Sequence, residues 1–202
     1  MSQFEFYLVI AGVVVAIAMA EIVGGWGQLV RANQGVKFDW LHFGWTLCVL
    51  LISMLYWVGM WPYSDLEFTY LGQVWFLVLP TLFLVVLAYA ITPDLSAASG
   101  INLREYYLAN RRPIFLSFGL FVLMSNVADF TIIGPASMMN FEGLISIVFV
   151  TLTVFLALTK RILVHTTALV VTLLYFIFLA FEPLENWLSR FDALTTATSM
   201  PQ

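Results

Sequence analysis

The chain has 202 residues, of which 62% are hydrophobic and only 10% are charged, and its mean hydropathy is +0.96. A soluble domain carries roughly 25% charged residues and about 45–50% apolar ones, so these values exclude a secreted enzyme and a disordered regulator. The formal net charge of −4 gives no basic surface for nucleic acid, and the single Cys48 excludes an intrachain disulfide. The composition is that of a multi-pass membrane protein.

Six stretches of the chain are long and apolar enough to cross a bilayer as helices. The hydrocarbon core is about 30 Å thick and needs about 20 apolar residues, and the ten-residue alternation of a β-barrel does not occur in them. The spans are expected at about Phe6 to Val30, Phe38 to Trp61, Tyr70 to Ile91, Pro113 to Gly134, Gly143 to Leu158 and Ile162 to Phe181. We therefore expect an all-α fold, a polytopic transmembrane bundle of six helices forming one domain over residues 1–183.

The basic residues predict the orientation of this bundle. All but one of the eight lie in the first, third and fifth loops, whereas the second loop carries Asp65 and Glu67 and the fourth carries Glu142. By the positive-inside rule, the odd-numbered loops are cytoplasmic and both termini lie outside. The seven basic residues in these loops are Arg31, Lys37, Arg104, Arg111, Arg112, Lys160 and Arg161.

Two segments outside the spans have helical character. Residues 103–107 in the long third loop are expected to form one or two turns resting on the inner face, before a span that opens at Pro113. Beyond Pro183, apolar residues recur at helical spacing. Residues 184–202 are therefore expected to form a short amphipathic helix on the outer surface, followed by a polar tail.

Glu21 is the most informative residue of the first span. It lies roughly 13 Å from the inner end of the helix at about 1.5 Å per residue, where an acidic side chain costs about 2.5–3.5 kcal/mol unless it faces protein or water. Gln28, seven residues on, shares its helix face. The pair predicts either a proton or cation site, or a carboxyl group that holds helices together by hydrogen bonds.

The same helix carries a stripe of small residues at every fourth position. Such a stripe allows a second helix backbone to approach closely and drives helix association in lipid. We expect this stripe to be a packing surface. Its members are Gly12, Ala16, Ala20 and Gly24.

A second polar group lies in the fourth span. Ser125, Asn126 and Asp129 share one helix face through i,i+3 and i,i+4 spacing, toward the outer end of the span. Asn126 is placed to hydrogen-bond Asp129, or either side chain to reach a neighbouring helix. The group predicts either an ion or proton site, or polar contacts that join helices.

The two histidines of the chain, His42 and His165, both lie about one turn inside the cytoplasmic ends of their spans. Equal depth raises the alternative that both imidazoles ligate one haem iron. Histidine near a membrane interface is also common without any ligand. No other metal or cofactor is expected.

Short motifs extend over the first two-thirds of the chain. With them the chain resembles a group of short bacterial multi-pass inner-membrane proteins, and this resemblance implies an inner-membrane location but no activity, because that group has none assigned. The motifs are Phe4-Glu5-Phe6-Tyr7, Gly25-Trp26-Gly27-Gln28-Leu29, Trp40, Leu103-Arg104-Glu105-Tyr106-Tyr107 and Asn110-Arg111-Arg112.

Two classes of function stay open at this stage. The sequence contains no phosphate-binding loop, zinc-protease helix or nucleophile elbow, so an enzyme is the weaker expectation. The first class is a non-catalytic subunit or assembly protein that binds a larger membrane complex, which the short loops favour. The alternative is a small homo-oligomeric channel or transporter with an acidic intramembrane site, and bis-histidine haem binding is a second alternative. The expected partners are the lipid bilayer and either further copies of the chain or a membrane complex, and not nucleic acid.

Overall fold

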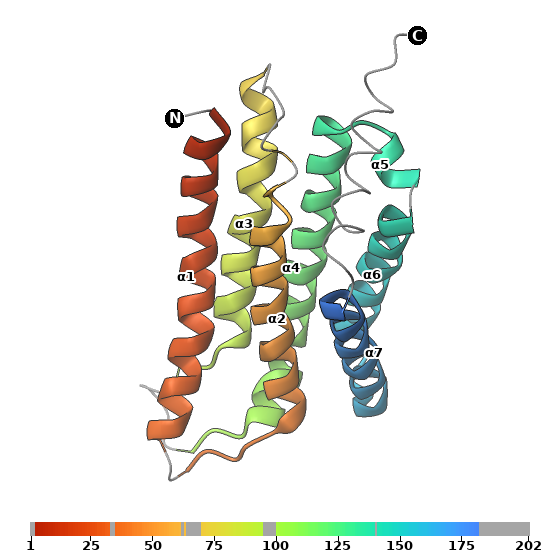
Figure 1. Cartoon of the computed structure of the whole chain (residues 1–202). Coiled ribbons are helices and arrows are strands. Elements are labelled where there is room, and N and C mark those ends of the chain that lie inside the picture. Colours follow the sequence, from red (N-terminus) through yellow and green to blue (C-terminus); the bar gives the residue numbers. More distant parts are fainter. Residues whose placement is uncertain are drawn as a thin grey trace.

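A computed structural model describes residues 3–32, 35–61, 63, 70–94, 100–139 and 141–181. Within these residues the chain is helical, with one isolated backbone bridge and no strand. Six long helices run up and down in a bundle (Figure 1). Their bounds are α1 Gln3–Arg31, α2 Trp40–Val58, α3 Leu71–Ile91, α4 Leu103–Ile132, α6 Phe141–Leu158 and α7 Ile162–Phe181, with the four-residue α5 at Ala136–Met139.

Four of these helices, α1, α2, α4 and α7, are long and apolar enough to cross a membrane. In α3 and α6 the described apolar stretches, Trp75–Ile91 and Glu142–Leu158, are shorter. Many large apolar side chains point away from the bundle, among them Val13 (57% exposed) and Leu163 (77% exposed). A membrane environment explains this outward apolar surface, whereas full spanning by all six helices stays a prediction.

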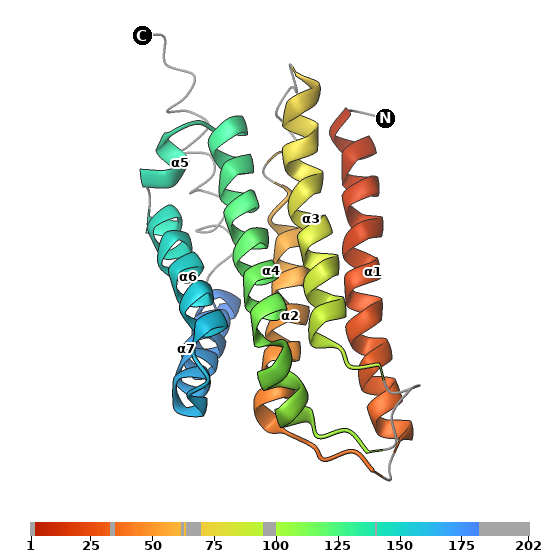
Figure 2. The same cartoon turned by 180° about the vertical axis from the view of Figure 1, so that it is seen from behind.

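The connections between the helices differ in charge between the two ends of the bundle. The α1–α2, α3–α4 and α6–α7 connections lie at one end of the bundle, and the α4–α6 connection with α5 lies at the other (Figures 1 and 2). We call the first the basic end, because Lys37, Arg104 and Lys160 belong to it, and the second the acidic end, after Asp129 and Glu142. The expected clustering of the odd-numbered loops is thus present, although which end faces the cytoplasm stays a prediction.

The start of α4 corrects the expected start of the fourth span. The turns at residues 103–107 do not rest separately on the inner face but are the first turns of α4, which continues through Pro113. The Asn102 side chain accepts from the Arg104 backbone amide at 3.2 Å and donates to Glu105 Oε1 at 2.9 Å. This N-terminal cap satisfies one of the first backbone donors of the helix, so the helix begins at Leu103, ten residues before the proline.

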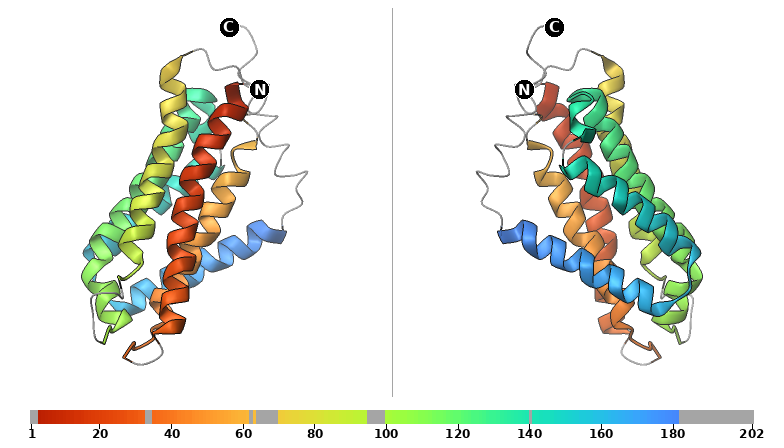
Figure 3. Two further views of the ribbon diagram at one scale, coloured as in Figure 1. Left: turned by 90° about the vertical axis from the view of Figure 1, so that its left-hand side faces the viewer. Right: turned by 90° about the vertical axis from the view of Figure 1, so that its right-hand side faces the viewer.

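The core lies between α4 and the helices around it. Trp45 of α2 meets the ring of Phe115 on α4 edge to face, with ring centres 4.9 Å apart, and both are buried. Close helix contacts depend on glycine: a methyl group on Gly44 would lie 2.5 Å from Leu169 of α7, and one on Gly119 would lie 2.6 Å from Thr153 of α6. Helix α7 is steeply tilted against α1 and α2 (Figure 3). The segment expected as an outer amphipathic helix, 184–202, lies outside the described residues.

Candidate functional site

The polar group of the fourth span lines a cleft toward the acidic end. This cleft has a volume of about 250 Å³ and lies between α2, α4, α6 and α7. A second hollow of about 180 Å³ shares Tyr56, Ser125 and Asp129 with it and reaches Glu142. We call the two together the acidic cleft. Its first part is lined by Ile52, Leu55, Tyr56, Phe121, Val122, Ser125, Asn126, Asp129, Ile145, Ser146, Phe149, Tyr175, Phe176 and Leu179.

Asp129 is held by a tyrosine from outside its own helix. Tyr63, buried in the segment after α2, donates its hydroxyl hydrogen to Oδ1 of Asp129. Burial, together with the neighbouring Asp129 carboxylate, raises the pKa of Tyr63 well above its usual range. The phenol therefore stays protonated and remains a donor at neutral pH. Within the described chain, no hydrogen bond reaches the second carboxylate oxygen of Asp129.

The neighbouring polar side chains donate to backbone carbonyls. Ser125 donates to Phe121 O at 2.9 Å, Asn126 to Val122 O at 2.7 Å, and Tyr56 of α2 to Leu77 O of α3 at 2.9 Å. The hydrogen bond that the sequence allowed between Asn126 and Asp129 is not formed, because the amide bonds its own helix instead. Since the hydroxyl hydrogens of Ser125 and Tyr56 are already used, these two groups present acceptor lone pairs to the cleft.

Apolar and aromatic side chains complete the walls. Tyr56 and Phe121 meet edge to face with ring centres 5.3 Å apart, and Phe149, Tyr175 and Phe176 line the same space. None of the described residues that line the cleft is basic. Among the described residues, the acidic cleft is therefore an aromatic-walled space with acidic but no basic side chains, within an apolar bundle.

The other predicted polar pair lies elsewhere. Glu21 is half-buried on α1, close enough to Tyr106 of α4 to act on it electrostatically, and Gln28 is exposed. Neither side chain lines the acidic cleft. Tyr106 donates to Ala90 O and Thr92 O at the end of α3, at 3.0 and 3.1 Å, so Glu21 lies beside a helix-joining contact.

The small-residue stripe is mostly unused within the chain. Gly12 packs against the Trp57 ring of α2, but Ala16, Ala20 and Gly24 are exposed. The face that α1 buries is a different one and includes Ala11, Val15, Ala18 and Ile22. An open apolar groove of about 550 Å³ runs between α1 and α2 beside the stripe and includes Gly12 and Ala16.

Both histidines have structural partners. His165 Nε2 donates to Thr159 O at 3.2 Å, and His165 Nδ1 accepts from the Tyr107 hydroxyl at 2.6 Å, which leaves no ring nitrogen free for iron. His42 Nε2 donates to Ile91 O at 2.8 Å. In the described part of the chain, no three His, Cys, Asp or Glu side chains gather as a metal site requires.

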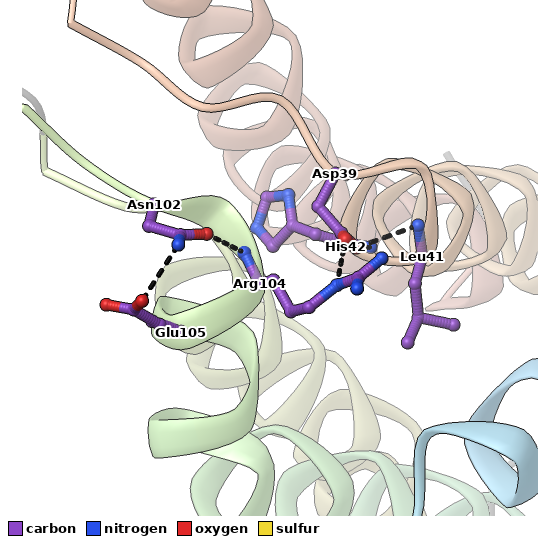
Figure 4. A network of polar contacts seen from close by, with 6 residues as sticks. All are labelled: Asp39, Leu41, His42, Asn102, Arg104 and Glu105. Carbon is purple, nitrogen blue, oxygen red and sulfur yellow. Dashed lines mark hydrogen bonds and ion pairs between the residues drawn. The ribbon is translucent and has the colours of Figure 1, made fainter.

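The basic end has a network that the sequence analysis missed (Figure 4). Asp39 is 4% exposed; its Oδ1 caps α2 by accepting from Leu41 N and His42 N at 3.0 and 3.1 Å, and its Oδ2 pairs with Arg104 Nε at 2.6 Å. A backbone bridge between Lys37 and Asn102 joins the same two connections. An aspartate directly before an apolar run is a helix-start signal that could have identified Asp39.

The chain matches no protein-family model, no curated protein and no solved structure among those with which it was compared. The resemblance to short bacterial inner-membrane proteins therefore stays a prediction. The candidate site therefore rests on the geometry of the chain itself. The acidic cleft contains a carboxyl group, has room for a small ligand and is lined by hydroxyl oxygens that can accept hydrogen bonds.

Proposed function

We propose that the chain is a small integral membrane protein that binds a cation at Asp129 and carries it across the bilayer. The observation that supports this proposal is the acidic cleft itself: a partly buried carboxylate, one oxygen of which is bound by no described residue, in a lined space. An acidic residue inside a membrane bundle is costly unless it is paired or faces a polar cavity. Here Tyr63 occupies only one of its oxygens.

The contrast between the two ends supports transport over simple binding. At the basic end, hydrogen bonds and one ion pair join α2, α3 and α4, whereas the acidic cleft lies near the opposite end. A bundle whose helices are joined by polar contacts at one end and that is hollowed near the other resembles one state of an alternating carrier. In line with the positive-inside pattern, we propose that the cleft faces the outside of a bacterial inner membrane.

Currents across proteoliposomes test this function. The purified chain is reconstituted and exposed to concentration jumps of protons, Na⁺ and benzylammonium while charge movement is recorded. A current with at least one of them, lost in Asp129→Asn and kept in Glu21→Gln, would support transport at the cleft. Glu21→Gln is the matched control, because Glu21 is also a half-buried acidic residue of a long helix and is likewise replaced by its amide. If no cation evokes a current, or if Asp129→Asn leaves it intact, the transport proposal is wrong.

A second candidate, a non-catalytic subunit of a larger membrane complex, is favoured by a different observation. Three members of the small-residue stripe face away from the chain's own bundle, next to the apolar groove between α1 and α2. Small residues allow close helix approach, so we propose this face as the contact with another helix if the chain works in a complex. Gentle purification tests it: a partner recovered in fixed stoichiometry, and lost in Gly24→Leu, would support the subunit function.

A further inference from the structure

The chemistry of the acidic cleft narrows the class of cation that it can hold. The hydroxyl hydrogens of Tyr56, Tyr63 and Ser125 are donated to protein acceptors. What they present to a ligand is lone pairs, next to the oxygen of Asp129 that no described residue binds. A ligand that fills this part of the cleft must therefore bring hydrogen-bond donors as well as positive charge.

The walls add a second requirement. Phe149 of α6 and Phe176 of α7 line the cleft together with Tyr56 and Phe121. Aromatic faces attract cations and also favour apolar groups. A hydrated Na⁺ ion would leave these walls without a matching surface, whereas an organic ammonium ion with an apolar substituent satisfies them and the carboxylate together.

The volume sets the size of the ligand. The part of the cleft with most of the aromatic residues has about 250 Å³, and an apolar cavity of roughly 150 Å³ is sufficient to take up benzene. A ring or a short alkyl chain with an amino group is therefore of the right size.

From these three features we infer that the acidic cleft binds a small primary or secondary ammonium ion, with its N–H groups directed at Asp129 and its apolar part among the aromatic side chains. This inference rests on the proposed function, whose cation it specifies. The same ammonium chemistry is offered by two sources, a free amine and the headgroup of phosphatidylethanolamine. Because the cleft lies near the acidic end of the bundle, both a free amine and a lipid headgroup are candidates for this ammonium group.

Calorimetric titration of the full chain in phosphatidylcholine nanodiscs tests the inference. Benzylammonium is the probe, and benzyl alcohol and benzyltrimethylammonium are the controls, which keep the ring and remove, respectively, the charge and the N–H donors. We expect benzylammonium to bind more tightly than both. Asp129→Asn should weaken its binding on the order of 10-fold to 100-fold, the loss typical of a charge-assisted hydrogen bond.

Matched variants separate the cleft from the rest of the bundle. Phe149→Leu should weaken binding by about threefold to tenfold, because an aromatic contact with the apolar part of the ligand is lost, whereas Phe155→Leu should not, because Phe155 is 53% exposed on the same helix. Glu21→Gln should bind as the unchanged chain does. Equal affinity for benzylammonium and benzyl alcohol, or unchanged binding in Asp129→Asn, would overturn the inference.

A labelling experiment on the unchanged chain keeps the inference testable if Asp129→Asn does not fold. Dicyclohexylcarbodiimide modifies carboxyl groups in apolar surroundings, and mass spectrometry locates the modified residue. Benzylammonium should protect Asp129 while benzyl alcohol should not; equal protection by both, or none by either, would contradict the site.

Nanodiscs that also contain phosphatidylethanolamine distinguish the source of the amine. If the lipid headgroup occupies the cleft, the apparent affinity for benzylammonium falls as its fraction rises; if the ligand is a free amine, the affinity does not change. A proton or Na⁺ current that depends on Asp129, without any ammonium binding, would overturn this inference and leave the proposed function standing. Ammonium binding at Asp129 without any current would overturn the proposed transport function and leave this inference standing.

Discussion

The acidic side chains at the two ends of the bundle differ in how many of their oxygens are bound by other residues. At the basic end both oxygens of Asp39 are bound, one by two backbone amides of α2 and one by Arg104. At the acidic end, Tyr63 binds one oxygen of Asp129, no described residue binds the other, and Asp129 lines a cleft. A carboxylate with full pairing contributes to stability, whereas one with a free oxygen in a cavity is available to a ligand. The pattern of pairing, more than burial, thus separates a structural acid from a candidate site.

We expect the two ends of the bundle to lie on opposite sides of the membrane. Cysteine labelling in a Cys48→Ala background tests this, with Pro135→Cys at the acidic end and Lys160→Cys at the basic end, both at exposed positions. The positive-inside rule predicts complete labelling of the first and none of the second by a membrane-impermeant maleimide on intact cells. Labelling of the second position only would reverse the orientation and move the acidic cleft to the cytoplasmic side.

Removing the fully paired acid should have the largest effect on stability. Asp39→Ala removes the cap of α2, which is worth about 1 kcal/mol, and leaves Arg104 without its partner. Because Arg104 is 46% exposed and can turn to solvent, the ion pair adds only about 1 kcal/mol. We expect a loss of about 2 kcal/mol in the free energy of unfolding, measured as a lower Tm in detergent. Asp39→Asn, which can still cap the helix, should lose about half of this; an equal loss in both variants would show that the cap contributes little.

The Tyr107–His165 contact tests whether other polar pairs toward the basic end are structural in the same sense. Both side chains are fully buried, and Tyr107→Phe would leave Nδ1 of His165 without a donor. An unsatisfied buried acceptor costs about 1–2 kcal/mol, which a chemical or thermal unfolding curve would detect. Tyr89→Phe is the matched control, because Tyr89 is 56% exposed. A loss as large in the control would contradict a specific role for the buried pair.

The residues of the two ends differ in how far the sequence could predict them. Apolar runs place the helices well, because backbone groups in lipid must be satisfied within the helix itself. The expected fourth span begins with the apolar run at Pro113, whereas α4 begins ten residues earlier, at Leu103, directly after the Asn102 cap. Proline is preferred in the first turn of a helix, but a proline does not mean that a helix begins at that position. The Asn102 cap is therefore the stronger signal for the start of α4.

The site is predictable only where it lies on one helix. Regular spacing on α4 identified Ser125, Asn126 and Asp129, and the structure brings all three to the cleft. Tyr63 is 66 positions from Asp129 along the chain, and their hydrogen bond depends on how α2 and α4 pack. No local pattern encodes such a contact. With 16% aromatic residues, no single ring in the sequence indicates an aromatic wall either.

At the acidic end, substitution should affect ligand binding more than stability. In Asp129→Asn the amide oxygen can still accept from Tyr63, and no ion pair is broken among the described residues. We therefore expect the free energy of unfolding to change by less than about 1 kcal/mol, with ammonium binding and transport lost. A loss as large as that of Asp39→Ala would place Asp129 with the structural acids and remove the difference between the two ends.

The smallest effect on the isolated chain is expected for the exposed part of the small-residue stripe. A side chain at Gly24 would meet nothing within 4 Å, whereas one at Gly12 would run into the Trp57 ring. Gly24→Leu should leave the Tm unchanged or raise it slightly, because glycine is the poorer helix former by about 0.5–1 kcal/mol, while Gly12→Leu should lower it. If the stripe binds another helix, Gly24→Leu should instead reduce the mass of the purified complex in light scattering at unchanged Tm. An unchanged mass would mean that this face meets lipid alone, and the subunit function would then lose the observation that favours it.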